Sequence, residues 1–144
     1  MRLKVLFVFL SAILFACGKP NVSHNMLPAI AAGTSSTAIY LSDGSGIDLF
    51  KLPIIDTSSK DSSGRAFKSL YYDYPVKKYY EIDKAIDESL TGQGYLKIED
   101  TVPEHVINKL LYVKPGFNTV VVQYEEIFKE GFQHNIRVLF WWHE

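Results

Sequence analysis

The chain contains very little cysteine, since Cys17 is the only one among its 144 residues. An intramolecular disulfide is therefore excluded, and the fold must be held by its hydrophobic core even in an oxidising compartment. Basic residues are not in excess either, because 15 lysines and arginines stand against 16 acidic residues. A nucleic-acid-binding domain would show a basic patch or stripe. We therefore expect no nucleic-acid partner.

Long hydrophobic runs are equally scarce. The longest is Val5–Phe15, which follows the positively charged Arg2 and Lys4 and ends before Cys17. A membrane-spanning helix needs about 20 apolar residues. A positive start followed by a shorter apolar run is typical of an export signal. We interpret residues 1–16 as such a signal.

The end of this run, Leu14-Phe15-Ala16-Cys17, resembles the lipobox of bacterial lipoproteins. Phe15 is bulkier than the small residue that is usual at its position. The resemblance implies cleavage after Ala16 and attachment of lipid to Cys17, with the mature protein anchored in the cell envelope. Gly18 stands where an aspartate tends to retain such proteins in the inner membrane. In a bacterium with two membranes, the resemblance thus implies the periplasmic leaflet of the outer membrane. The alternative is an ordinary secretory signal, or a buried apolar strand, with a chance cysteine.

Cleavage after Ala16 removes two of the 15 basic residues and no acidic one, which leaves 13 against 16 and a net charge of −3. This charge gives no additional attraction to anionic lipid, so the lipid on Cys17 must hold the protein. Residues 17–37 are rich in glycine, proline, serine and alanine, and they predict a flexible tether. Its one apolar segment, Met26–Ile30, is a candidate for docking on the domain. We expect a single globular domain over residues 38–144.

The periodicity of residues 38–144 predicts an α+β domain, with an antiparallel sheet of about four to five strands and one main helix on one face. In residues 78–90, Ile82, Ile86 and Leu90 recur every four residues, which predicts a helix with one apolar stripe. Thr101 starts a capping-box pattern that predicts a helical turn to about residue 108. The remaining expected elements are strands at 38–41, 48–52, 67–74, 95–99, 109–114, 119–124 and 136–143, a polar loop at 56–65, and turns at 42–46, 115–116 and 129–131.

No combination of residues predicts catalysis, a metal or a cofactor. The histidines do not have the i, i+4 spacing of a helical metal site. Asp43–Asp48 lacks the spacing of a calcium loop and predicts a tight turn. The adjacent Glu125 and Glu126 should point to opposite sides of a strand. We therefore expect no enzymatic activity. The histidines are His24, His105, His134 and His143.

The aromatic residues are the best candidates for recognition. Trp141 and Trp142 are adjacent in the last strand, so they should face opposite sides of the sheet. Trp142 alternates in step with Val138 and Phe140, which predicts that it is the core member and that Trp141 lies on the other face.

One helix covers only one face of a sheet, so the face of Trp141 is expected to be open to a partner. Further candidates, whose side depends on the strand register, are Tyr71, Tyr112 and Tyr124. In the alternative arrangement, residues 38–52 fold back and cover this face.

These patterns favour a non-enzymatic, lipid-anchored envelope protein that binds a protein or another envelope component through its sheet. One alternative is an immunity or exclusion lipoprotein, which would bind a single toxin or phage factor tightly. The other is a small periplasmic hydrolase, which would need a polar cleft.

Overall fold

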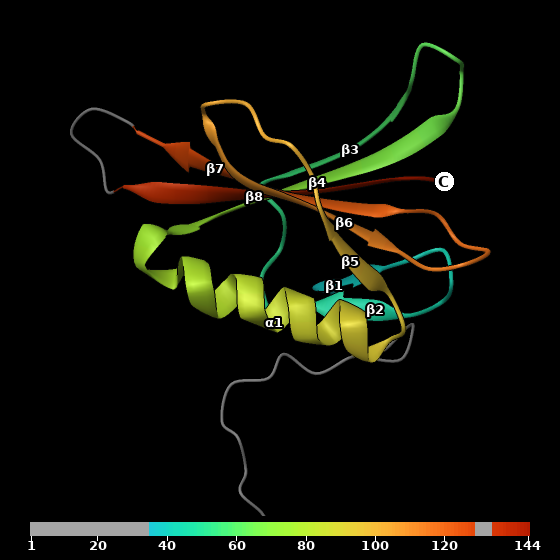
Figure 1. Cartoon of the computed structure of the whole chain (residues 1–144), viewed down its shortest axis with the longest axis horizontal. Coiled ribbons are helices and arrows are strands. Elements are labelled where there is room, and N and C mark those ends of the chain that lie inside the picture. The colour runs from blue at the N-terminus through green and yellow to red at the C-terminus, as the bar shows by residue number, and fades with distance from the viewer. Residues whose placement is uncertain (1–34, 129–133) are drawn as a thin grey trace, which may run out of the picture.

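The computed structural model describes residues 35–128 and 134–144. The expected signal, Cys17, most of the expected tether and the turn expected at 129–131 lie outside these ranges. The described chain forms a six-stranded antiparallel sheet, a separate two-stranded hairpin and an α-helix (Figure 1). The predicted α+β class is thereby confirmed.

The sheet has the strand order β3-β4-β8-β7-β6-β5. Its six strands exceed the expected number of about four to five, so that expectation was wrong. The missed strand is β3, which was expected to be a polar loop. All its side chains are exposed, and its pairing with β4 comes from the backbone. The strands are β3 (Ile55–Lys60), β4 (Ala66–Pro75), β5 (Leu96–Glu99), β6 (Val106–Val113), β7 (Val120–Ile127) and β8 (Asn135–His143).

A short 3-10 turn, η1 (Val76–Lys78), leads into the helix α1 (Tyr79–Gly92). The predicted apolar stripe is confirmed, because Ile82, Ile86 and Leu90 are all buried in the hydrophobic core. The helical turn expected after Thr101 was wrong: residues 101–105 are not helical, and β6 starts at Val106.

The hairpin of β1 (Ala38–Tyr40) and β2 (Gly46–Asp48) lies on the same side of the sheet as α1 (Figure 1). Its Ile39 and Ile47 are buried in the same core cluster as the helical stripe. The side-chain amide of Gln93, just after α1, donates a hydrogen bond to the Gly46 carbonyl. The alternative in which residues 38–52 cover the opposite face is therefore wrong.

Asp48 fastens the start of the described chain to the hairpin. The residue is 2% exposed, and its carboxylate accepts hydrogen bonds from Thr37 Oγ1 at 2.6 Å, Ser35 Oγ at 2.7 Å and the Phe50 N–H at 2.7 Å. Burial alone would raise the pKa of Asp48, but these three donors outweigh it and lower the pKa. Ser35 and Thr37, which we expected at the end of the tether, are thus bound to the domain.

Several tyrosines bring their hydroxyl groups into the core. Tyr112 is fully buried, and its hydroxyl donates a hydrogen bond of 3.0 Å to Asp87 of α1. Burial is the main cause that raises the pKa of Tyr112 and Tyr124 well above the ordinary value of 10.0. Burial also raises the pKa of Tyr74 and of Tyr95 to about 12. These residues must therefore remain protonated for the native packing to persist.

We expect the domain to lose stability steeply between pH 10 and pH 12. In the unfolded chain the tyrosines ionise near their ordinary pKa of 10.0, whereas Tyr74 and Tyr95 hold their protons to about pH 12 when folded. Their contribution is complete below pH 10 and is lost as the pH rises through this window, on the order of 2–3 kcal/mol for each residue. Urea unfolding followed from neutral pH to pH 12 measures this loss, and Tyr95→Phe should reduce it. A difference in tyrosinate absorbance between the wild type and Tyr95→Phe that appears already near pH 10, while both proteins are folded, would contradict the prediction.

Candidate recognition face

No element of the described chain packs on the sheet face opposite α1. Trp142 is 7% exposed and belongs to the core cluster, whereas Trp141 is half-buried on the opposite face. The predicted division of the two tryptophans is confirmed. Trp141 lies across from Ser69 of β4 and Val121 of β7, so paired strands on both sides hold its backbone.

The tyrosine candidates divide between the two faces. Tyr71 pairs with Leu139, two residues from Trp141, and shares its face. Tyr124 pairs with Val138, a core residue, and Tyr112 pairs with Val120, which is also in the core. Both Tyr112 and Tyr124 are 0% exposed. Their assignment to the recognition face was therefore wrong, because the register turns them toward α1.

Aromatic side chains surround a shallow hollow of about 390 Å³ on the open face. The His143 ring contacts Trp141 edge-on at 6.2 Å between ring centres, and Phe67 edge-on at 6.4 Å. This geometry is the favoured one for aromatic pairs. The lining residues are Asp61, Phe67, Ser69, Tyr71, Leu139, Trp141 and His143. All of them except Asp61 belong to β4 or β8, and the alternation of side chains along these two strands places them on one face.

The turn of the β3–β4 hairpin forms a wall beside this hollow. Figure 1 shows that the hairpin rises on the side of the sheet away from α1. At its turn the Asp61 carboxylate accepts hydrogen bonds from the Ser63 hydroxyl at 2.6 Å and from the Arg65 N–H and side chain at 3.0 and 2.9 Å. The Ser63 hydroxyl is the largest cause of the lowered pKa of Asp61. The hydrogen bonds make the turn a defined structure, with Gly64 at φ +83°.

Charged residues border the aromatic hollow at one end. Arg137 makes two hydrogen bonds to Asp73, at 2.8 and 3.1 Å, in the register position next to Tyr71 and Leu139. The guanidinium carbon of Arg137 also lies 5.9 Å from the centre of the Tyr71 ring. The open face therefore has an aromatic part and a charged part, so its chemistry differs from one end to the other.

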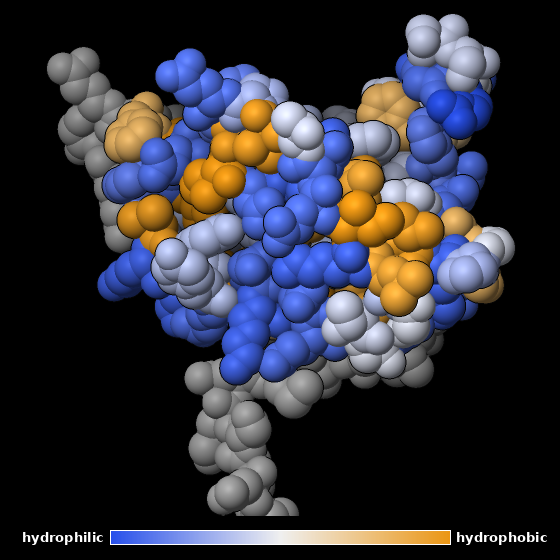
Figure 2. All heavy atoms as spheres, viewed as in Figure 1, coloured by the Kyte–Doolittle hydropathy of each residue, from blue (hydrophilic) through white to orange (hydrophobic). Residues whose placement is uncertain are grey.

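Apolar side chains continue across the face toward the other edge of the sheet. In register with Trp141 follow Val121, then Leu111 of β6, then Ile98 of β5. Ile98 and Leu96 of β5 are 48% and 67% exposed. Figure 2 shows the molecule from the side on which β5 lies in front, with hydrophobic patches between hydrophilic side chains.

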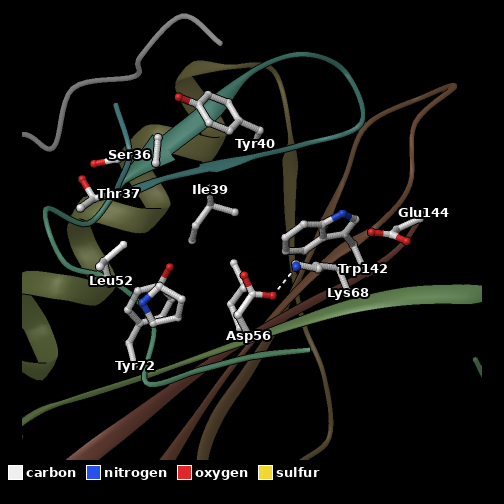
Figure 3. A pocket seen from close by; sticks show the side chains of 13 residues that line it. Ser36, Thr37, Ile39, Tyr40, Leu52, Asp56, Lys68, Tyr72, Trp142 and Glu144 are labelled. Atoms are coloured by element: carbon white, nitrogen blue, oxygen red, sulfur yellow. Dashed lines mark ion pairs between the residues drawn. The ribbon is translucent and has the colours of Figure 1, made fainter. Parts of the chain in front are cut away.

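A second cavity, of about 350 Å³, lies on the helix side of the sheet. Figure 3 shows it between the β1 strand and the sheet, with Trp142 and Tyr72 along it and Tyr40 at the hairpin. Lys68 and Asp56 form an ion pair in its lining. The lining also includes Glu144, so the cavity combines apolar surface and hydroxyl groups with charged side chains.

Two of the residues considered for chemistry, Asp43 and His134, are engaged in local structure. Asp43 sits in the predicted tight turn and accepts hydrogen bonds from the Ser45 N–H at 3.0 Å and Lys114 Nζ at 2.6 Å. His134 lies 3.2 Å from Glu126, and its ring stacks on Phe128 at 4.3 Å between centres. Within residues 35–128 and 134–144, no group of three or more histidine, cysteine or acidic residues could hold a metal ion.

The same described residues contain no helix that is long and apolar enough to span a membrane. Comparisons with protein-family models, with curated proteins and with solved structures found no match to this chain.

Proposed function

We propose that this chain is a non-enzymatic, lipid-anchored protein of the bacterial envelope that binds a protein partner through the open sheet face around Trp141. The observation that carries the proposal is the aromatic hollow on a face that no described element covers. The anchoring part of the proposal comes from the lipobox resemblance at Leu14–Cys17.

The open face has the composition of a recognition surface. Aromatic residues are enriched among the side chains that contribute most of the binding energy in protein interfaces. The hollow around Trp141 is within the range of about 300–1,000 Å³ that is typical of binding pockets. Its volume of about 390 Å³ is lined by three aromatic side chains besides His143.

The face is also rigid before a partner arrives. Trp141 and Tyr71 stand on strands that are paired on both sides, and the Asp61 turn is held by its own hydrogen bonds. Ordering a flexible surface on binding costs free energy, and a surface that is already ordered avoids this cost. The Arg137–Asp73 pair at one end would favour one orientation of a polar partner segment.

Replacing Trp141 by alanine is expected to weaken partner binding about thirtyfold, because an aromatic anchor commonly contributes 2 kcal/mol or more. The partner is captured from envelope extracts with the wild-type protein, purified, and titrated against both proteins. The matched control is Tyr80→Ala, which removes an aromatic side chain that is 81% exposed on α1. The control should bind as the wild type does.

Equal affinity of the partner for Trp141→Ala and for the wild type would overturn the assignment of this face. Thermal unfolding must accompany the titration, since the interpretation requires that Trp141→Ala keeps a melting temperature close to that of the wild type.

A further inference from the structure

Large hydrophobic side chains point into solvent from the segment that joins β2 to the sheet. Phe50, Leu52 and Ile54 are 61%, 62% and 49% exposed. Three large exposed hydrophobic side chains within five residues are unusual on a protein surface. Exposed apolar patches generally mark sites that contact another molecule or a membrane. We call residues 50–54 the apolar strap.

The backbone of the strap is fixed, so these side chains are held outward. The Phe50 N–H donates to Asp48 at 2.7 Å, and the Ile54 N–H donates to the Tyr71 carbonyl at 2.8 Å. Between them, Lys51 Nζ donates to the Asp73 carbonyl at 2.6 Å. Phe50 adopts a left-handed φ of +51°, which a side chain of this size takes only where its surroundings impose it.

The strap lies where the amino-terminal part of the chain joins the domain. The Asp48 carboxylate that binds the Phe50 N–H also binds the Ser35 hydroxyl. Leu52 lines the same cavity as Ser36 and Tyr40, and Figure 3 shows all three around it. The Tyr40 hydroxyl donates to the Ser35 carbonyl at 2.8 Å. A chain arriving from Cys17 therefore enters the domain beside these hydrophobic side chains.

We propose that the apolar strap is a membrane-contacting surface, which inserts Phe50, Leu52 and Ile54 into the lipid head-group region on which Cys17 is anchored. This inference rests on the lipid anchor of the proposed function. Residues 18–34 separate Cys17 from Ser35 and span at most about 60 Å when fully extended. The anchor therefore keeps the strap at a high local concentration near the lipid, of order millimolar, at which a weak insertion becomes populated.

The chemistry of the strap favours the apolar interior of the lipid layer over its charges. The ammonium group of Lys51 is already engaged with the Asp73 carbonyl and lies 4.8 Å from the centre of the Tyr74 ring. The mature chain would carry a net charge of −3, from 13 basic and 16 acidic residues after cleavage at Ala16. Because apolar burial is not screened by ions, added salt should not weaken the contact. Tyr40, with its apolar ring and bound hydroxyl, suits the boundary between lipid and water.

The test uses the whole lipidated protein, reconstituted in vesicles of phosphatidylethanolamine and phosphatidylglycerol that include lipids with nitroxide-bearing acyl chains. Since the lipid occupies the only native cysteine sulfur, Leu52→Cys provides a single free thiol for an environment-sensitive fluorophore. The matched control is Ile98→Cys on β5, at the opposite edge of the sheet, where the native side chain is 48% exposed. The nitroxide lipids should quench the label of Leu52→Cys severalfold more strongly than that of Ile98→Cys, at low and at high salt.

Equal quenching of the two labels would overturn the inference, as would quenching that disappears at high salt. If the strap instead contacts residues 26–30, a second copy or another protein, the label of Leu52→Cys is shielded from water but not quenched by the lipid, which also overturns it. A failure of the lipid anchor is recognised separately, because the protein then does not remain on the vesicles and Cys17 itself reacts with the fluorophore.

Discussion

Replacing Leu90 by alanine is expected to lower the free energy of unfolding by about 2–5 kcal/mol. Leu90 is 0% exposed in the last turn of α1 and packs in the core cluster between the helix and the sheet. Alanine removes buried apolar groups and leaves a cavity that the surrounding strands cannot fill without moving. A small domain has only about 5–15 kcal/mol of total stability. The substitution should therefore remove a large part of it.

The matched control is Tyr80→Ala in the same helix. It removes a larger side chain that is 81% exposed, so the stability should change by no more than about 0.5 kcal/mol. Chemical denaturation of both variants and of Ile86→Ala, whose native side chain is also 0% exposed, measures the difference. A near-neutral effect of both Leu90→Ala and Ile86→Ala would mean that the helix stripe is not the centre of the core.

Replacing Cys17 by serine is expected to abolish lipid attachment and membrane retention altogether. The thioether to lipid requires the cysteine sulfur, and Cys17 is the only cysteine of the chain. Two or three acyl chains, at about 0.8 kcal/mol per buried methylene group, hold a protein on a membrane essentially permanently. Without them, the weak contact of the apolar strap cannot retain the protein. Metabolic labelling with palmitate, followed by membrane fractionation, measures both effects in the native host.

Phe15→Ala is the control for this experiment, because it alters the same motif toward the usual small residue and leaves the cysteine in place. This variant should be labelled and retained like the wild type. Mass spectrometry that finds an unmodified Cys17 in mature protein from the native host would contradict the lipoprotein proposal. The structure of the domain would be unaffected by that result.

Local periodicity determined the elements whose burial follows a regular repeat. The spacing of Ile82, Ile86 and Leu90 predicted α1 because residues four apart share one side of a helix. Alternation in the last strand assigned Trp141 and Trp142 to opposite faces, since successive side chains of a strand point to opposite sides. The turn predicted at Pro115-Gly116 is a further example, because Pro-Gly suits the centre of a type II turn, where glycine supplies a positive φ. Gly116 has the required φ of +82°, and the Phe117 N–H donates to the Lys114 carbonyl.

Periodicity did not predict β3, a strand of the sheet that buries none of its side chains. β3 is entirely exposed, so its polar side chains resemble those of a loop, and only the backbone pairing with β4 makes it a strand. The prediction of a helical turn after Thr101 was wrong for a related reason. Its capping pattern is local, and the pairing of β6 with β7 from Val106 onward overrides it.

The sequence by itself thus determined the α+β class, the helix stripe and the opposite orientation of the two tryptophans. The tertiary structure decided the placement of Tyr112 and Tyr124, because a register shift of one residue moves every side chain of a strand to the other face. It also decided that the β1–β2 hairpin lies beside α1, which leaves the face of Trp141 uncovered by described elements. Both outcomes depend on pairings between residues far apart in the chain. Such pairings cannot be predicted from the spacing of residues within either segment alone.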